Sequence, residues 1–341
     1  MNDELSPATR RLLDQRLEAA RAAARLPALA AALLRDDGSP LWTGATGSVD
    51  GRPPGGDTQF RVGSITKTFT AVLVLRLREE GLLGLDDRLD RHLPGLPEAV
   101  GAATVAQLLA HTAGLPLDPP ESPRPEGPRP EGPHPEGRRS PADLLGEPPV
   151  LHPAGAAHHY SNVGYALLGA LVERHRQTSW DEALAAELLR PLGMRRTTRR
   201  PQAPAAGGWS ADPRTGAPRP EPALDFGALA PAGQYWSTLG DLARWAAFLA
   251  RGREGVLSAA AVAGMRRPAV VEGCYGLGLE LWREDGAEFA GHTGSVPGFR
   301  AALLLAPAAG LTGIVLGNSS TPVPGGADGL ARDLIRHALR D

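Results

Sequence analysis

The chain has 341 residues, enough for one large domain or two smaller ones, and its hydrophobic fraction of 42% can form a sizeable core. A formal net charge of −2 with interspersed acids and bases gives no indication of a polyanion-binding surface, so we expect no nucleic-acid partner. The lone cysteine, Cys274, excludes an intrachain disulfide and is expected to be a small buried filler. An acidic N-terminus without a long apolar run predicts a cytoplasmic protein with no membrane segment.

Hydrophobic periodicity divides the chain into helices and strands. Apolar residues at helical spacing predict helices over residues 7–25, 64–81, 104–112, 164–174, 180–189, 238–249 and 327–339. Apolar runs and alternation predict strands over residues 26–34, 41–44, 275–282, 299–305 and 311–316. This order implies an α/β lobe built from both ends, residues 1–65 and 235–341, with an inserted helical lobe, residues 66–234.

A short repeat interrupts the predicted helical lobe. Residues 124–137 repeat Pro-Glu-Gly in five-residue units without apolar anchors. Such a composition is typical of an extended, solvated segment, so we expect a disordered loop at about residues 118–140. The repeat is either a tolerated expansion or a lid over a binding site.

The most informative stretch is Ser64-Ile65-Thr66-Lys67, at the start of a predicted helix. Lys67 is the only lysine in the chain, and the other 35 cationic residues counted with it are arginines. An arginine stays protonated, whereas a lysine amine can lose its proton when it is desolvated. A serine and a lysine three residues apart share one face of a helix. The pattern therefore indicates a nucleophile beside an amine base.

Two further motifs have the residue types that this chemistry needs. Tyr160-Ser161-Asn162 precedes a predicted helix, and asparagine is rare in this chain, at positions 2, 162 and 318 only. His292-Thr293-Gly294-Ser295 lies between strand-like segments, where Gly294 permits close approach of the backbone to a ligand. Each motif alone is typical of a cap or a turn, but their order and separation reinforce one another.

Other catalytic and cofactor patterns are missing from the sequence. There is no Gly-x-Ser-x-Gly elbow, no His-Glu-x-x-His and no phosphate-binding loop. The neighbouring His158 and His159, with His152, are a poor metal-ligand set because adjacent histidines point apart. We therefore expect neither a metal nor a cofactor.

With these motifs, the chain resembles the superfamily of serine β-lactamases and penicillin-recognising enzymes. The likeness is greatest to the branch of class C β-lactamases, D,D-carboxypeptidases, D-aminopeptidases and β-lactamase-like esterases. It extends from about residue 26 to residue 339 and includes the segments Phe60–Gly63, Gln107–Leu115, Tyr165–Gly169, Arg190–Met194 and Pro297–Phe299. The resemblance implies an α/β (α+β) fold of the β-lactamase/transpeptidase type, with an antiparallel sheet flanked by helices.

The resemblance also implies roles for the motif residues. Ser64 would be the nucleophile, Lys67 and Tyr160 would share the proton transfers, and Asn162 would orient Lys67 or a substrate amide. His292, Thr293 and Gly294 would bind or orient substrate along a strand edge formed by residues 295–300. The backbone N–H groups of Ser64 and Ser295 would form the oxyanion hole.

One departure from the pattern of the resembled family narrows the range of expected activities. His292 stands where many β-lactamases have a lysine, and a mostly neutral histidine suits a substrate carboxylate poorly. We expect an esterase or D-amino-acid peptidase that acts on a small ester, thioester or amide through a Ser64 acyl-enzyme. An acyltransferase or an amide-forming, peptide-releasing biosynthetic enzyme is the main alternative. A β-lactamase or a non-catalytic ligand sensor is less favoured, and the sequence leaves the oligomeric state open.

Overall fold

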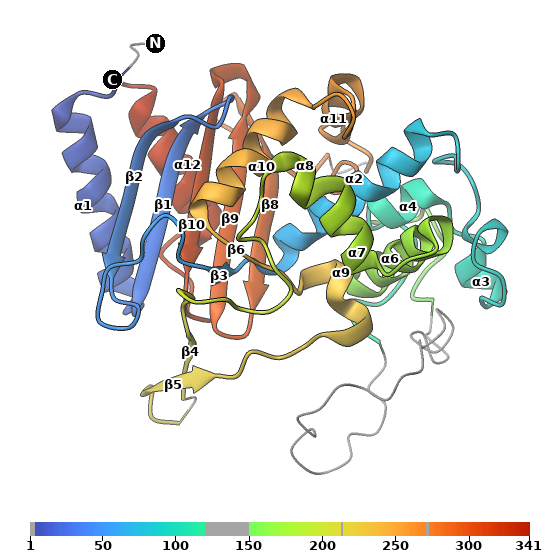
Figure 1. Cartoon of the computed structure of the whole chain (residues 1–341), viewed down its shortest axis with the longest axis horizontal. Helices are drawn as coiled ribbons and strands as arrows, with labels where there is room; N and C mark the ends of the chain where they lie inside the picture. Colours follow the sequence, from blue (N-terminus) through green and yellow to red (C-terminus); the bar gives the residue numbers. More distant parts are fainter. Residues whose placement is uncertain (1–3, 120–149, 213, 271–272) are drawn as a thin grey trace.

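The computed structural model describes residues 4–119, 150–212, 214–270 and 273–341 (Figure 1). The predicted loop at 118–140 lies outside these ranges except for Asp118 and Pro119. A six-stranded antiparallel sheet has the order β2-β1-β10-β9-β8-β7. Its strands are β1 (Ala28–Arg35), β2 (Pro40–Gly47), β7 (Glu280–Glu284), β8 (Ala287–Val296), β9 (Phe299–Ala306) and β10 (Leu311–Gly317).

Helices cover both faces of the sheet. The terminal helices α1 (Pro7–Ala24) and α12 (Gly326–Ala338) pack on one face, and α10 (Leu239–Arg251) lies on the other (Figure 1). Strand β1 is buried almost throughout because Leu29, Ala31 and Leu33 face the terminal helices while Ala30, Ala32 and Leu34 face the opposite cluster. This two-sided burial explains its continuous apolar sequence.

The remaining helices form the second half of the molecule around α2 (Thr66–Glu79), which is buried along most of its length. Around it lie α3 (Glu98–Gly101), α4 (Val105–Leu109), α6 (Asn162–Arg176), α7 (Trp180–Leu184), α8 (Arg190–Leu192), α9 (Ala230–Gly233) and α11 (Ala259–Met265). A π-helical turn, Ala185–Leu189, joins α7 to α8. Two short antiparallel pairs complete the strands: β3 (Phe60–Arg61) with β6 (Trp236–Ser237), and β4 (Gly208–Ala211) with β5 (Pro218–Glu221).

The predicted antiparallel sheet with flanking helices is confirmed, and most predicted elements occur within a few residues of their expected bounds. One buried cluster contains side chains from the sheet and from the helical half, including Ala32, Phe69, Leu167 and Leu303. The two-lobe division at residues 65 and 235 therefore stays a prediction. Within the described ranges, no helix is long and apolar enough to cross a membrane.

Three local predictions were wrong. The strand expected over 275–282 begins only at Glu280, because the preceding segment turns toward the helices and Gly278, at φ 83°, packs on Ala71. The motif from His292 to Ser295 lies inside β8 rather than between strands. Cys274 is exposed and not a buried filler, since it precedes that turn at the surface.

Candidate active site

The serine of the first motif lies in a tight turn pressed against the sheet. Ser64 occupies a 3-10 turn, Gly63–Ile65, that leads directly into α2. Gly63 has a φ of 54°, and a Cβ built on it would lie 3.0 Å from the backbone nitrogen of Ser295. A Cβ on Gly294 would lie 2.0 Å from the carbonyl oxygen of Val62. Only glycine permits this approach, which brings the serine turn and β8 together.

The lone lysine is fully buried beneath this turn. Lys67 Nζ donates to Ser64 Oγ at 3.2 Å, to Asn162 Oδ1 at 2.6 Å and to the carbonyl oxygen of Ala232 at 2.8 Å. Burial lowers the pKa of Lys67 to about 7, although the carboxylates of Glu280 and Asp118 act in the opposite direction. An amine with this pKa is partly neutral near pH 7 and can accept a proton.

The second motif reaches the same point from the start of α6. Ser161 caps this helix by accepting from the N–H of Gly164 at 3.0 Å, which places Asn162 in its first turn and Tyr160 just outside it. Lys67 Nζ lies 4.7 Å from the ring centroid of Tyr160. Burial raises the pKa of Tyr160 well above 10, while a hydrogen bond with Ser64 lowers it. Tyr160 is therefore a protonated phenol at neutral pH, suited to donating a proton.

The third motif contributes an open strand edge and a buried histidine. Strand β7 pairs with β8 only as far as Gly291, so within the described parts of the chain the following residues have no strand partner on that side. Thr293 donates from Oγ1 to Glu280 Oε1 at 2.8 Å. His292 is completely buried, and both of its ring nitrogens are engaged, so its ring lies behind the strand edge rather than in the open.

A chain of hydrogen bonds links the second motif to the third through two residues for which the sequence suggested no role. The N–H of Ser161 donates to His111 Nδ1 at 3.0 Å, so Nε2 carries the proton of a neutral ring and faces Tyr275 Oη at 3.2 Å. Tyr275 Oη in turn lies 2.9 Å from His292 Nε2. His292 Nδ1 donates to the carbonyl oxygen of Thr293 at 2.6 Å. Because Nδ1 of His111 accepts and Nδ1 of His292 donates, the bonds between them have fixed directions. His111 Nε2 donates to Tyr275 Oη, and the Tyr275 hydroxyl donates to His292 Nε2.

Burial keeps this chain uncharged. It lowers the pKa of His111 well below 6.5, lowers the pKa of His292, and raises the pKa of Tyr275 well above 10. Only four tyrosines occur in the chain, and three of them, Tyr160, Tyr165 and Tyr275, gather around Lys67 and His111. This concentration of a rare residue is a signal by which sequence reasoning could have found Tyr275.

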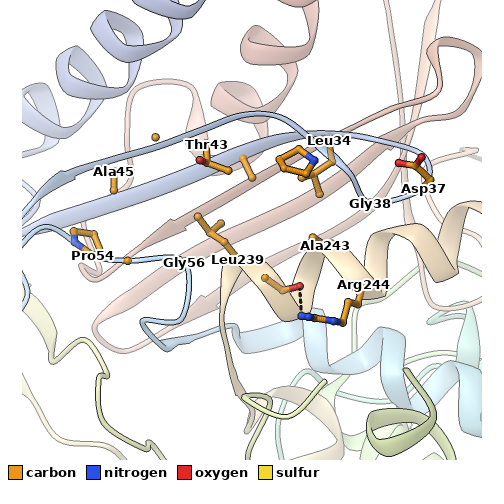
Figure 2. A pocket seen from close by; sticks show the side chains of 15 residues that line it. Leu34, Asp37, Gly38, Thr43, Ala45, Pro54, Gly56, Leu239, Ala243 and Arg244 are labelled. Carbon is orange, nitrogen blue, oxygen red and sulfur yellow. Dashed lines mark hydrogen bonds between the residues drawn. The ribbon is translucent and has the colours of Figure 1, made fainter. Parts of the chain in front are cut away.

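A cavity of about 470 Å³ lies elsewhere, between the start of α10 and the face of β1 and β2 (Figure 2). Its lining is mostly small or apolar, including Ala32, Thr43, Pro54 and Leu239, with Arg244 at one end. It contains none of the predicted site residues. For metals, no group of three possible ligands occurs in the ranges that the structure covers.

Comparison with known proteins identifies the class to which this fold and site belong. The model of the Beta-lactamase family matches residues 13–337, so the chain belongs to that family. It is a β-lactamase-like protein of the serine hydrolase type.

Several particular proteins are similar to this chain over most of its length. "Penicillin-binding protein 4" of Amycolatopsis lactamdurans is 29% identical over 316 residues, which cover 83% of this chain and 77% of the relative. The solved structure of SurE is 29% identical, with a TM-score of 0.78, over 97% of this chain and 76% of that one. A D-stereospecific amidohydrolase from Streptomyces sp. is 26% identical, with a TM-score of 0.74, over 96% and 97%.

Proposed function

We propose that the protein is a serine amidase or esterase of the D-amino-acid peptidase type, which forms an acyl-enzyme on Ser64. The observation that carries this proposal is the contact between Ser64 Oγ and the buried Nζ of Lys67, at 3.2 Å. Burial that lowers the pKa of Lys67 to about 7 gives the amine the property that a general base requires.

The arrangement supports a complete hydrolytic cycle. Neutral Lys67 takes the proton of Ser64 as Oγ attacks the substrate carbonyl carbon, and the backbone N–H groups of Ser64 and Ser295 stabilise the resulting oxyanion. Tyr160 gives its proton to the leaving amine or alcohol and recovers one from Lys67. Water then attacks the acyl-enzyme with the same groups in reverse, which releases the acid and restores Ser64.

Asn162 and the β8 motif have supporting roles in this proposal. Asn162 holds Lys67 through its Oδ1, while Thr293 and Gly294 border the strand edge along which the acyl group would lie. The buried ring of His292 supports this strand edge by donating from Nδ1 to the Thr293 carbonyl oxygen. The intact set of groups favours an enzyme over a non-catalytic sensor, and a neutral His292 disfavours an efficient β-lactamase.

The substrate class is proposed from chemistry and from likeness to relatives. An amidohydrolase named as D-stereospecific is among the similar solved structures, and SurE has also been solved with D-Leu. We therefore propose a small amide or ester of a D-amino acid as the acyl donor. The cytoplasmic location expected from the sequence is kept as part of the proposal. Transfer of the acyl group to an amine instead of water would use the same residues.

Intact-mass analysis tests the mechanism directly. The wild-type protein, exposed briefly to a fluorophosphonate, a p-nitrophenyl ester and a penicillin, should gain the fluorophosphonate mass within minutes and turn over the ester. Peptide mapping should place the adduct on Ser64, and the Ser64→Ala variant should gain none. A folded wild-type protein with neither adduct nor turnover would refute the proposal.

A further inference from the structure

A buried arginine close to the nucleophile in sequence has no part in the proposed proton transfers. Arg61 belongs to β3, three residues before Ser64, and is only 1% exposed. Burial lowers the pKa of Arg61 to about 10, so the guanidinium is still charged at neutral pH. The fold therefore contains a buried positive charge directly behind the serine turn.

Within the described ranges, no carboxylate forms an ion pair with Arg61. Asp225 raises the pKa of Arg61 from a distance, but it is itself paired with Arg199 at 2.7 Å. The Nε of Arg61 is also buried, and no acceptor for it occurs in the described parts of the chain. A buried charge without a counter-ion lowers stability, and proteins retain such features mainly at functional sites. Arg61 is therefore a candidate for a functional role.

The guanidinium of Arg61 holds a stretch of irregular backbone. Residues 222–226 follow β5 and form neither helix nor strand. Arg61 Nη2 donates to the Leu224 carbonyl oxygen at 2.7 Å, and the guanidinium carbon lies 4.0 Å from the centroid of the Phe226 ring. One buried side chain thus fixes two points of a segment that has no regular hydrogen bonding of its own.

This segment meets the serine turn at α9. A Cβ built on Gly233 would lie 3.5 Å from the Phe226 ring and 3.8 Å from the carbonyl carbon of Gly63. Gln234 follows α9 as its C-cap, and its Oε1 accepts from the Phe226 N–H at 2.7 Å and from Arg61 Nη2 at 3.2 Å. The end of α9 is therefore bonded both to the buried guanidinium and to the segment that the guanidinium holds.

A carbonyl group of α9 determines where the amine lone pair of Lys67 points. Ala232 in this helix accepts from Lys67 Nζ at 2.8 Å, and Asn162 Oδ1 accepts at 2.6 Å. A neutral amine has two N–H groups, so these two acceptors use both and leave the lone pair directed at Ser64 Oγ, 3.2 Å away. Without the Ala232 carbonyl, neutral Lys67 would donate to Ser64 instead of accepting its proton.

We propose that Arg61 is a positioning residue of this site. Together with Gln234 it fixes the end of α9, and so holds the Ala232 carbonyl against Lys67. This inference rests on the proposed function, since it concerns the amine base of that reaction. A guanidinium suits the position because its planar face stacks on an aromatic ring while its edge donates to two acceptors.

The rate and the pH dependence of acylation test this role. Arg61→Lys keeps the charge without the planar geometry, and Arg61→Met removes both. In each variant kcat/KM for p-nitrophenyl acetate should fall about ten- to a hundredfold, the scale expected for a misplacement of about 1 Å. The apparent pKa of kcat/KM should also fall below the wild-type value, because a carbonyl oxygen that accepts from the ammonium form favours that form. A purely structural role would leave this apparent pKa unchanged.

Phe226→Leu is a milder variant that leaves the buried charge in place. It removes the aromatic face beneath the guanidinium, so kcat/KM should fall about threefold, with the same direction of change in the apparent pKa. Circular dichroism and denaturant unfolding identify the variants that are folded, and only these are compared. If the Arg61 variants do not fold, Phe226→Leu decides the question, and wild-type values for it would overturn the proposal.

A matched control removes an arginine from the other end of α2. Arg76 is half-buried, and its Nη1 donates to the carbonyl oxygens of Gly255 and Val256 at 2.7 Å each. Arg76→Met should lower the free energy of unfolding, keep kcat/KM within about twofold of wild type and leave the apparent pKa unchanged. An equal change of the apparent pKa in this control would overturn the assignment to Arg61.

Arg61→Lys gives the sharpest contradictory outcome. If it matches wild type in both rate and apparent pKa, the planar guanidinium positions nothing and the proposal is overturned. Fluorophosphonate labelling of wild-type Ser64 reports on the proposed function separately. Its failure would overturn both proposals, whereas labelling together with unchanged kinetics in the Arg61 and Phe226 variants overturns only this one.

Discussion

The cavity beside α10 and the region around Ser64 differ in their chemistry. The cavity between α10 and the β1–β2 face is lined mainly by alanine, glycine and proline, and its charged groups, Asp37 and Arg244, lie at the rim (Figure 2). The region around Ser64 instead contains a buried amine that bonds to Ser64 and two buried imidazoles that are joined through the hydroxyl of Tyr275. Of the two regions, the cavity is therefore the one with the poorer chemistry.

The difference teaches that burial of titratable groups is a better guide to catalysis than open space. Around Ser64, burial shifts each pKa in the direction that favours the neutral group. It lowers the pKa of Lys67 and of His292 and raises the pKa of Tyr160. At the other cavity, the side-chain and backbone hydrogen bonds of Ser39 lower the pKa of Asp37, an ordinary effect for an exposed carboxylate. No buried amine is among the residues that line this cavity.

The largest effect should follow from removing the amine. Lys67→Arg keeps a positive charge but cannot supply a neutral base, and Lys67→Met removes the charge with a similar length. Both variants should acylate about a hundred- to ten-thousandfold more slowly, because general-base catalysis of this kind contributes roughly 10²–10⁴-fold. Stopped-flow measurement of acylation by a p-nitrophenyl ester checks this, and circular dichroism confirms the fold. Near-normal acylation in Lys67→Arg would refute the role given to Lys67.

Lys67 also determines whether activity rises or falls with pH. Since only neutral Lys67 accepts a proton, kcat/KM of wild type should rise with pH through an apparent pKa of about 7. Stability should change in the same direction: the unfolded chain binds the proton more tightly, so the free energy of unfolding rises from pH 7 toward pH 10. Lys67→Met should lack this particular increase, which denaturant unfolding at the two pH values would show.

The contacts at the start of α2 illustrate what sequence reasoning could reach. Ser64 and Lys67 were predictable because they lie three positions apart at the start of a predicted helix and because a unique lysine is conspicuous. Asn162 was predictable from its motif, and the structure places it 2.6 Å from Lys67 Nζ. The contact between Ser64 and Lys67 is local, so their spacing was sufficient to predict it. Asn162 lies 95 residues from Lys67, so its place beside the amine was expected only from the family resemblance.

Other features depended on contacts that local spacing does not encode. His111 and Tyr275 are 164 residues apart in sequence, and neither has a neighbour that indicates their hydrogen bond. The alternation over 275–282 was typical of a strand, but Gly278 adopts a positive φ to pack against Ala71. That packing turns the chain away from the sheet, and it also leaves Cys274 exposed instead of buried. Tertiary contacts overrode local pattern in each case.

A smaller effect is expected from breaking the buried hydrogen-bond chain. Tyr275→Phe removes the hydroxyl that bonds to His292 and His111, which should destabilise the fold by about 1–3 kcal/mol. Because His292 holds the carbonyl of Thr293, kcat should fall about tenfold with little change in KM, as expected when a strand edge loses its alignment. Tyr235→Phe is the matched control, since it removes another buried tyrosine hydroxyl, one that donates to Asp181 Oδ1 at 2.8 Å outside this hydrogen-bond chain. Equal losses of kcat in both variants would reduce Tyr275 to a structural residue.

The smallest effect should come from the cavity that lacks this chemistry. Thr43 is an exposed residue of the outer strand β2, opposite Ala32 in the register, and lines the cavity. Thr43→Ile adds apolar volume there and suits a strand, so the free energy of unfolding should change by no more than about 0.5 kcal/mol. Steady-state kcat/KM should remain within about twofold of wild type, because three other strands separate β2 from β8 in the sheet. A tenfold loss of activity without loss of stability would mean that the cavity is coupled to Ser64, and the contrast between the two regions would then fail.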